Sequence, residues 1–310
     1  MRASLAATAV TGALLVALVA VPAAAQQFRL GGYVKGQYMH TDEGAPQDKL
    51  DITMLRPWVK GQLGDDVALF AMYHLSTAGS GMLLDSWLAW KDPWAQSQLR
   101  GGQFQVPVGF ENPLSSSKLD FITRSYVTTG VFPGSYDTGL TVDGVLGHMN
   151  GELPLHYVLS SLSGKGRGNW DFGWKRDTSL VIGLPLAKGS EFQGSYYWGV
   201  RRHDLGFGLK WQDEKWRVQG EWFNGAAGAL AHDGWYLLGR YDLTPKQYVA
   251  ARFEEYDPDH ATVADARERW TLGYGIFPAK SIRVLANLEL RDGPAAFAND
   301  RFGVEAQYVW

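Results

Sequence analysis

Histidine and carboxylate side chains are the groups in this chain that could carry out acid–base or metal chemistry. An enzyme needs a nucleophile, a base and an orienting group in one site, but neither G-x-S-x-G nor H-E-x-x-H occurs in the sequence. No group of His, Asp and Glu has the spacing of metal ligands, and there is no cysteine. We therefore expect no enzyme, no metal site and no cofactor. The scattered histidines are His40, His74, His148, His156, His203, His232 and His260.

Charged side chains can also act without reacting, by attracting or repelling ions. The long stretch 107–136 contains Glu111, Lys118, Asp120 and Arg124, and Asp85 precedes it. A charge acts most strongly on a passing ion where a narrow gap and a low-dielectric wall limit the screening by water. These five residues are candidates for a constriction if the fold places them around a passage.

The elements that must position these residues are β-strands, because the dominant period of the chain is two. Successive side chains of a strand point to opposite faces. In residues 190–200 an apolar row alternates with a mostly polar row, and the pattern returns in 205–211, 282–290 and 302–310. Each of these segments therefore has one apolar and one polar face. The apolar row of the first segment is Phe192, Gly194, Tyr196, Trp198 and Val200.

Counting such segments predicts about sixteen strands, and most have the ~9–11 residues that a tilted strand needs to cross the hydrocarbon core of a bilayer. The second segment contains Pro57, which cannot donate a ladder hydrogen bond. The predicted strands are 27–40, 49–63, 66–76, 80–91, 97–106, 137–147, 149–162, 177–187, 190–200, 202–213, 215–224, 233–243, 245–257, 267–277, 280–291 and 300–310.

The connections between these strands alternate between tight and long. Tight turns such as Gly64-Asp65-Asp66 and Thr244-Pro245 contain the residues that favour turns. Outer-membrane barrels show this asymmetry, with short periplasmic turns and longer outer loops. We therefore predict one all-β domain at 26–310, a transmembrane antiparallel β-barrel. Both termini should lie in the periplasm because the strand count is even. The longer connections are 41–48, 107–136, 163–176, 225–232, 258–266 and 292–299, whereas 77–79 and 201–202 are short.

Residues 1–25 have the three parts of a secretory signal peptide. Arg2 supplies the positive charge, residues 4–20 are almost all apolar or small, and Ala23-Ala24-Ala25 provides an A-x-A cleavage site. An N-terminal membrane anchor is the alternative, but the apolar run is short and ends in small residues. We expect residues 1–25 to be removed on export, leaving a mature chain in the outer membrane of a Gram-negative type of cell.

The composition agrees with a membrane barrel better than with other exported classes. A net charge of −3 gives no indication of a nucleic-acid partner. A soluble β-sandwich would also alternate, but it needs neither so many strands nor an aromatic residue at the end of an apolar row. That residue, Trp310, resembles the terminal signal that the barrel assembly machinery recognises. Girdles of Trp facing the lipid headgroups are expected near the strand ends, at Trp211, Trp216, Trp222, Trp235, Trp270 and Trp310.

The polar face of such a barrel lines its lumen, and the apolar face meets lipid. About sixteen strands enclose an aqueous channel rather than a packed core. The strand phases place basic and acidic side chains in nearly equal number on the inner wall, and only those at a constriction would govern selectivity. The basic wall residues are Lys35, Arg56, Lys60, Lys210, Arg217, Arg240, Arg252 and Arg283, and the acidic ones are Asp85, Glu191, Asp204, Glu221, Asp242, Glu254 and Glu289.

One stretch, from Gln103 to Ser125, contains Gly109-Phe110-Glu111, then Ser116-Ser117-Lys118, then Arg124. These elements resemble the G-L-E, the S-S-K and the later arginine of the phosphate-selective porin O and P family, and weaker likeness covers most of the mature chain. The resemblance implies a third loop that folds into the barrel, narrows the pore and attracts anions with its basic residues. The second strand of that family has an arginine doublet, whereas this chain has the single Arg56, so phosphate specificity does not follow.

These features favour a passive porin for small hydrophilic solutes, with a weak to moderate anion preference because the acidic and basic residues of the constriction nearly balance. A barrel that sheathes or docks a partner, such as a periplasmic redox protein, is the alternative. It would have an occupied lumen and a third loop that does not narrow it. A barrel enzyme is a third possibility without a supporting motif. The solute and the oligomeric state stay open, and a homotrimer is compatible with the sequence.

Overall fold

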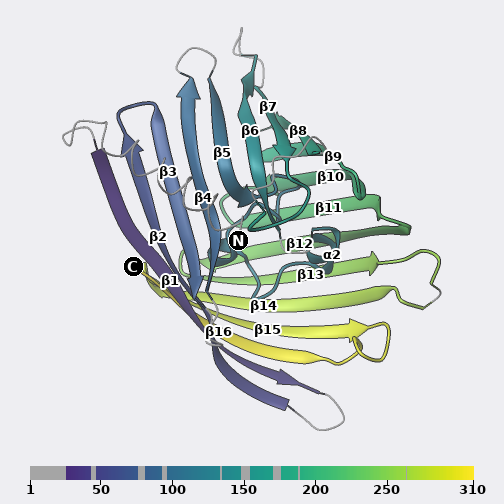
Figure 1. Ribbon diagram of the computed structural model, residues 1–310. Helices are drawn as coiled ribbons and strands as arrows, with labels where there is room; N and C mark the ends of the chain where they lie inside the picture. Colours follow the sequence, from purple (N-terminus) through teal and green to yellow (C-terminus); the bar gives the residue numbers. More distant parts are fainter. Residues whose placement is uncertain are drawn as a thin grey trace.

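The computed structural model describes residues 26–42, 47–75, 81–92, 96–132, 135–147, 154–169, 176–187, 189–262 and 264–310. The predicted signal peptide, residues 1–25, lies outside the described residues. Strands make up most of the described chain. A short 3-10 helix, η2 (Ser116–Lys118), and a short α-helix, α2 (Tyr126–Val131), follow one another in the chain between β5 (Ser97–Gln105) and β6 (Tyr136–Leu146), and in space α2 lies beside β12 (Leu230–Thr244) and β13 (Gln247–Asp257) (Figure 1). No helix among the described residues is long and apolar enough to cross a bilayer.

The strands form one closed antiparallel barrel in which each strand pairs with its neighbours in sequence. Pairing of Tyr33–Thr41 with Arg301–Val309 joins the first strand to the last. The predicted all-β barrel and its strand number are therefore confirmed. The strands are β1 (Gln26–Thr41), β2 (Gln47–Leu63), β3 (Val67–Leu75), β4 (Gly81–Asp92), β5 (Ser97–Gln105), β6 (Tyr136–Leu146), β7 (Leu155–Leu162), β8 (Asp177–Ala187), β9 (Ser190–Trp198), β10 (Arg202–Gln212), β11 (Trp216–Ala227), β12 (Leu230–Thr244), β13 (Gln247–Asp257), β14 (Arg267–Ala279), β15 (Ile282–Asp292) and β16 (Arg301–Val309).

Side chains alternate between the two faces of the barrel wall. On β10, Phe207 is 43% exposed on the outside, whereas Asp204 is 1% exposed on the inside. An apolar outer face and a polar inner face suit a barrel in a bilayer, because only the outer face meets hydrocarbon and closure leaves no strand edge unpaired. Apolar side chains exposed on the outside include Tyr196, Trp198, Leu205, Phe207, Leu209, Trp211, Leu288, Leu290, Phe302 and Tyr308.

Two details of the wall differ from the sequence pattern or refine it. The predicted long connection at 225–232 is wrong, because β11 and β12 stay paired as far as Ala227 and Leu230, and only residues 228–229 separate them. Pro57 lies within β2, as its segment predicts. β2 and β3 are not paired between Leu55 and Trp58. Pro57, which has no backbone N–H to donate, therefore lies in an interruption of the hydrogen-bond ladder.

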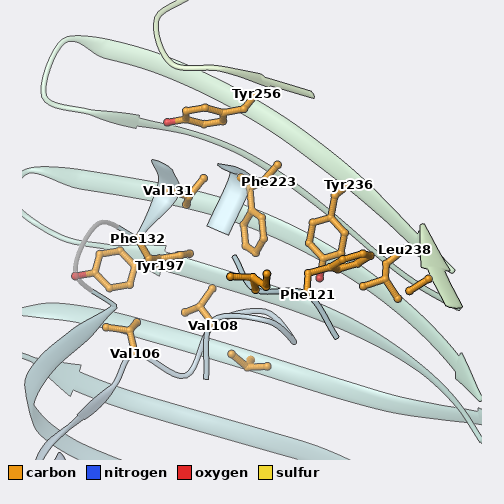
Figure 2. Packing of buried hydrophobic residues seen from close by; sticks show 14 of the residues in the cluster. Val106, Val108, Phe121, Val131, Phe132, Tyr197, Phe223, Tyr236, Leu238 and Tyr256 are labelled. Carbon is orange, nitrogen blue, oxygen red and sulfur yellow. The ribbon is translucent and has the colours of Figure 1, made fainter. Parts of the chain in front are cut away.

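Loop 3, described at residues 106–132 and 135, turns into the barrel and packs on its inner wall (Figure 2). The helix α2 lies against β11, β12 and β13. Phe132 meets the rings of Tyr197 and Phe223 edge-on, with centroids 5.9 Å apart in both pairs. Each such aromatic contact contributes about 0.5–1.5 kcal/mol beyond its buried area. The buried apolar residues of the loop include Val106, Val108, Phe121, Ile122, Val127, Val131 and Phe132.

A glycine lets the loop approach the wall closely at its first turn. Gly109 has φ +70°, and a Cβ there would lie 2.3 Å from a carboxylate oxygen of Glu221. Only glycine adopts this conformation without steric cost and leaves room for the neighbouring carboxylate. Further along, Ser125 caps α2 by accepting a hydrogen bond from the Thr128 N–H. The path of loop 3 is thus set by local backbone chemistry as well as by apolar burial.

Candidate pore constriction

Glu111 fastens loop 3 both to itself and to the wall. Its carboxylate accepts hydrogen bonds from the Ser125 N–H at 2.9 Å and the Ser125 hydroxyl at 2.6 Å. The guanidinium of Arg252, on β13, lies 3.2 Å away and is almost fully buried. Burial by itself would raise the pKa of the Glu111 carboxyl, but the Arg252 charge and the Ser125 hydrogen bonds outweigh it and lower that pKa. Glu111 is therefore an ionised anchor inside the barrel.

A second carboxylate holds the loop from the side of the wall. Glu221, on β11, accepts hydrogen bonds from the backbone N–H groups of Phe110, at 2.5 Å, and Glu111, at 3.0 Å. The Tyr236 hydroxyl donates to the same carboxylate. The sequence pattern places Glu221 on the inner face, but it does not reveal that this residue receives the turn of loop 3.

Asp120 is the third anchor. Its two carboxylate oxygens accept from Arg217 at 2.8 Å and Arg240 at 2.7 Å. The Tyr248 hydroxyl donates to the Asp120 backbone carbonyl at 2.8 Å. The carboxylate of Asp120 is thereby neutralised by two wall arginines, so it contributes little free negative charge to the lumen.

The tip of loop 3 is bonded to the strands at the barrel closure. Lys35 donates to the Ser116 carbonyl at 2.9 Å and pairs with Glu305 at 2.8 Å. Arg283 donates to the Leu119 carbonyl at 2.7 Å. Arg56 donates to the Ser116 hydroxyl at 2.9 Å. All of the predicted basic wall residues except Lys60 have a contact to loop 3 among the described residues: Lys35, Arg56, Lys210, Arg217, Arg240, Arg252 and Arg283.

The second half of the loop rests on an ion-pair network that the sequence interpretation missed. Arg269, on β14, pairs with Glu254 at 2.5 Å and Glu289 at 3.1 Å. The same guanidinium donates to the Arg124 carbonyl at 2.8 Å and stacks 3.8 Å from the Tyr126 ring centre. Alternation could have placed Arg269 on the inner face with Glu254 and Glu289, but no sequence signal joins it to the loop.

The two basic residues of the predicted constriction differ in their contacts. Arg124 is partly buried and donates to the carbonyl oxygens of Glu111 and Leu114, so its guanidinium braces the loop. Lys118 ends η2 and is exposed. No carboxylate of the described chain lies within ion-pair distance of Lys118. Lys118 is therefore the basic residue of this loop whose charge faces open space.

Asp85 lies apart from this set. It is partly exposed on β4, where the Tyr136 hydroxyl donates to it at 3.3 Å. Tyr136 begins β6, at the end of loop 3. Glu111 and Asp120 thus anchor loop 3 to the wall, and Arg124 braces the loop from within. Lys118 has no ion pair among the described residues, and Asp85 lies on the wall at the other end of the loop.

Two cavities lie beside the loop, towards the end of the barrel with the tight turns. The larger, about 1300 Å³, extends from Phe110 and Lys118 to the turns at 189–190 and 211–216. The smaller, about 400 Å³, lies between Lys118 and the turn at 280–281. Lys118 and Arg217 line both cavities. The exposed charge of loop 3 therefore faces solvent-accessible space on this side.

The wall formed by β2, β3 and β4 is different in character. Three aromatic rings follow one another across these strands, with centroids 6.1 Å apart for Trp58 and Phe70 and 5.6 Å apart for Phe70 and Trp87. The guanidinium carbon of Arg100 lies 5.0 Å from the centre of the Trp87 ring. This part of the inner face therefore offers aromatic stacking surface, beside the ion pair of Arg100 with Asp143 at 3.2 Å.

A group of possible metal ligands occurs at the opposite rim. Asp233, Asp257 and His260 have ligand atoms within 4.8 Å of one another. His260 already pairs with Asp233 at 2.5 Å. The sequence shows no ligand spacing because Asp233 lies on β12 and reaches the other two only through the pairing of β12 with β13.

Comparison with known proteins adds evidence on the fold. No family model matches the chain, and no curated protein matches it in sequence. Among solved structures, an anion-selective porin from Comamonas acidovorans aligns with a TM-score of 0.69 at 12% identity, covering 92% of this chain and 100% of that chain. Salmonella typhi OmpF in complex with daunomycin aligns with a TM-score of 0.72 at 12% identity, covering 92% and 98%.

A third neighbour is the trimer form of OmpT, an outer membrane protein of Vibrio cholerae, with a TM-score of 0.66, 13% identity, and 92% and 100% coverage. At these identities the likeness concerns the backbone. The resemblance to the phosphate-selective family is not confirmed by these neighbours, which are porins and outer-membrane proteins of other descriptions. The chain has the closed sixteen-stranded barrel fold of bacterial outer-membrane porins.

Proposed function

We propose that this protein is an outer-membrane porin, a passive diffusion channel for small hydrophilic solutes with a weak to moderate preference for anions. The observation that carries the proposal is the wide barrel with a polar inner face and an inward loop fastened by ion pairs. About sixteen strands enclose an aqueous space. Loop 3 is held to the inner wall by ion pairs and narrows this space. The similarity of the fold to an anion-selective porin supports the same conclusion.

Local charge supports the direction of the preference. Glu111 and Asp120 are each paired with wall arginines, whereas Lys118 is exposed. Unpaired Lys and Arg side chains at a constriction favour anions. Asp85 opposes this effect from the wall, so the preference should be weak. No observation supports the tight phosphate site of the resembled family.

Solute uptake into proteoliposomes tests the channel directly. We expect liposomes that contain the protein to admit small uncharged sugars and to exclude large oligosaccharides, because the pore is open but narrowed. Liposomes with the protein that exclude every sugar would favour the alternative, a barrel that sheathes or docks a periplasmic partner.

Export, assembly and membrane orientation belong to the same proposal. We expect the mature chain to begin at Gln26 after removal of residues 1–25, to reside in the outer membrane with both termini in the periplasm, and to be recognised by the barrel assembly machinery. A homotrimer agrees with the trimeric form of one structural neighbour. Mass spectrometry of outer-membrane fractions would show the processed N-terminus, and recovery of a soluble unprocessed chain would contradict the proposal.

A further inference from the structure

A further cavity lies at the rim of the barrel opposite the tight turns. It has a volume of about 240 Å³ and lies between the end of loop 3, the start of β6, residues 164–166 and the turn that joins β9 to β10. We call it the rim cavity. Pockets for drug-sized ligands measure about 300–1,000 Å³, so the rim cavity suits a smaller molecule. Its charged lining residues are Asp137, Asp177, Arg201 and Arg202.

The two carboxylates of the rim cavity are almost fully buried. Asp137, on β6, is 3% exposed, and Asp177, on β8, is 5% exposed. Both adjoin Gly164. The Gly164 N–H donates to Asp137 at 2.9 Å, and a Cβ at Gly164 would lie 2.5 Å from the carboxyl carbon of Asp177. The two acids therefore converge on one point of the lining.

Neither acid has an ion pair within the described part of the chain. Asp204, nearby on β10, differs because it pairs with Arg202 at 2.9 Å and with His232 at 2.7 Å. A buried carboxylate without a counter-charge is costly, and a cation supplied by a bound solute would offset that cost. The hydrogen-bond donors to the two acids are all neutral, namely the N–H groups of Thr138, Gly164 and Val200 and the hydroxyls of Ser163 and Tyr197.

Positive charge and aromatic surface complete the lining. Arg201 is exposed in the turn between β9 and β10 and has no ion pair among the described residues. Arg202 is held by Asp204, and its guanidinium carbon lies 5.4 Å from the centre of the Phe132 ring. The rings of Phe132 and Tyr197, which also line the rim cavity, meet edge-on at 5.9 Å (Figure 2). The rim cavity thus combines buried negative charge with one unpaired positive charge.

This lining suits an ammonium group better than a metal ion. Among the described residues, the side chains that could share a metal lie at Asp233, Asp257 and His260, and that group includes neither acid of the rim cavity. A primary ammonium carries several N–H donors, which two carboxylates can accept together. A guanidinium such as that of Arg201 favours a carboxylate partner.

We propose that the rim cavity binds a small zwitterionic α-amino acid, whose ammonium group lies between Asp137 and Asp177 and whose carboxylate pairs with Arg201. A simple amine would engage the acids alone, and a simple carboxylate would engage the arginine alone. The inference rests on the proposed function, because it names a class of small hydrophilic solute for the same barrel.

Calorimetry with the purified full-length protein in detergent tests the site without requiring conduction. The probes are L-alanine, ethylamine and propionate, and we expect L-alanine to bind most tightly. Asp177→Asn keeps an acceptor for the Tyr197 hydroxyl but removes the charge, so it should weaken binding of both L-alanine and ethylamine by about tenfold or more. The matched control is Asp143→Asn, on the same strand as Asp137 but outside the rim cavity.

A second variant tests the carboxylate half of the site and does not depend on a buried residue. Arg201→Gln removes one exposed charge, so it should weaken L-alanine binding by roughly two- to fivefold and leave ethylamine binding unchanged. The control is Arg29→Gln, an exposed arginine on β1 that does not line the rim cavity.

Each outcome decides for or against the site. Ethylamine that binds as tightly as L-alanine, or calcium that displaces L-alanine, would overturn the assignment to amino acids. Equal losses in Asp177→Asn and Asp143→Asn would overturn the site itself. A chain that conducts no ions yet binds L-alanine through Asp177 would overturn the proposed function and keep this inference. A conducting channel that does not bind L-alanine would overturn this inference alone.

Discussion

The carboxylate of Glu111 and the guanidinium of Arg252 meet 3.2 Å apart inside the barrel, where the first belongs to a loop and the second to the wall. Both side chains are nearly inaccessible to water. A buried pair of this kind contributes little net stability compared with an apolar pair, but its loss leaves one charge uncompensated. The pair therefore acts mainly by fixing the position of loop 3.

Removing the negative charge of this pair should release the loop. Glu111→Gln removes the loop carboxylate from Arg252, which keeps its ion pair with Glu254 at 3.3 Å and its hydrogen bonds to the Thr123 and Arg124 carbonyls. We therefore expect the free energy of unfolding to fall by about 1–3 kcal/mol, the cost of a buried charged hydrogen bond that is lost. Urea unfolding in lipid vesicles measures this change. The control Glu268→Gln removes an exposed carboxylate from β14 and should have little effect. Equal stability of both variants would show that Glu111 does not anchor the loop.

A substitution at the first turn of the loop tests its close approach to β11. Gly109→Ala places a methyl group against Glu221 in addition to imposing a positive φ on alanine. The control Gly228→Ala has a similar φ of +65°, but nothing lies within 4 Å of its added Cβ. Both should lose about 1 kcal/mol from backbone strain, and Gly109→Ala should lose more. A larger loss in Gly228→Ala, measured by thermal unfolding, would contradict this account.

How far the sequence predicts the structure differs between wall and loop. The period of two identifies the strands because one face meets an apolar medium and the other a polar one, and the outward Phe207 and inward Asp204 follow it. The bonds of loop 3 are not periodic. The sequence predicts that Arg124 is a charge at the constriction. In the structure its guanidinium instead donates to two backbone carbonyls of the loop. The sequence does not reveal these contacts, because they depend on how the loop folds in three dimensions.

The C-terminal residue offers a test of assembly. Trp310 exchanges backbone hydrogen bonds with Gly32 on β1, with N···O distances of 3.1 and 3.3 Å. A Cβ on Gly32 would lie 2.2 Å from the Trp310 ring. Deletion of Trp310 should lower the yield of heat-modifiable protein in the outer membrane, because both a seam contact and the expected assembly signal are lost. Trp211→Ala, which removes another exposed Trp, should not. Unchanged yield after the deletion would rule out the assembly role.

His260, which pairs with Asp233 at the rim of the barrel, should titrate above the usual histidine range. The hydrogen bond from His260 to Asp233 raises the pKa of this exposed histidine above its usual value. The pKa of His260 is higher in the folded protein than the value of about 6.5 in the unfolded chain. The pair of His260 with Asp233 therefore stabilises the rim fully at pH values below about 6.5, and this stabilisation is lost as the pH rises through the folded-state pKa. Histidine NMR titration should show the raised pKa, and Asp233→Asn should lower it towards the ordinary histidine value. An unchanged pKa in that variant would exclude Asp233 as the cause.

Ion selectivity of single channels in a planar bilayer measures whether the barrel is open and whether loop 3 gives it an anion preference. In a potassium chloride gradient, the wild-type protein should form open channels whose reversal potential indicates a weak anion preference. Lys118→Gln should shift that potential towards cations while the barrel still assembles, because it removes the exposed charge of loop 3. Arg124→Gln should mainly alter conductance stability, because Arg124 braces the loop. A correctly folded barrel that does not conduct, or a wild-type channel that prefers cations, would contradict the account.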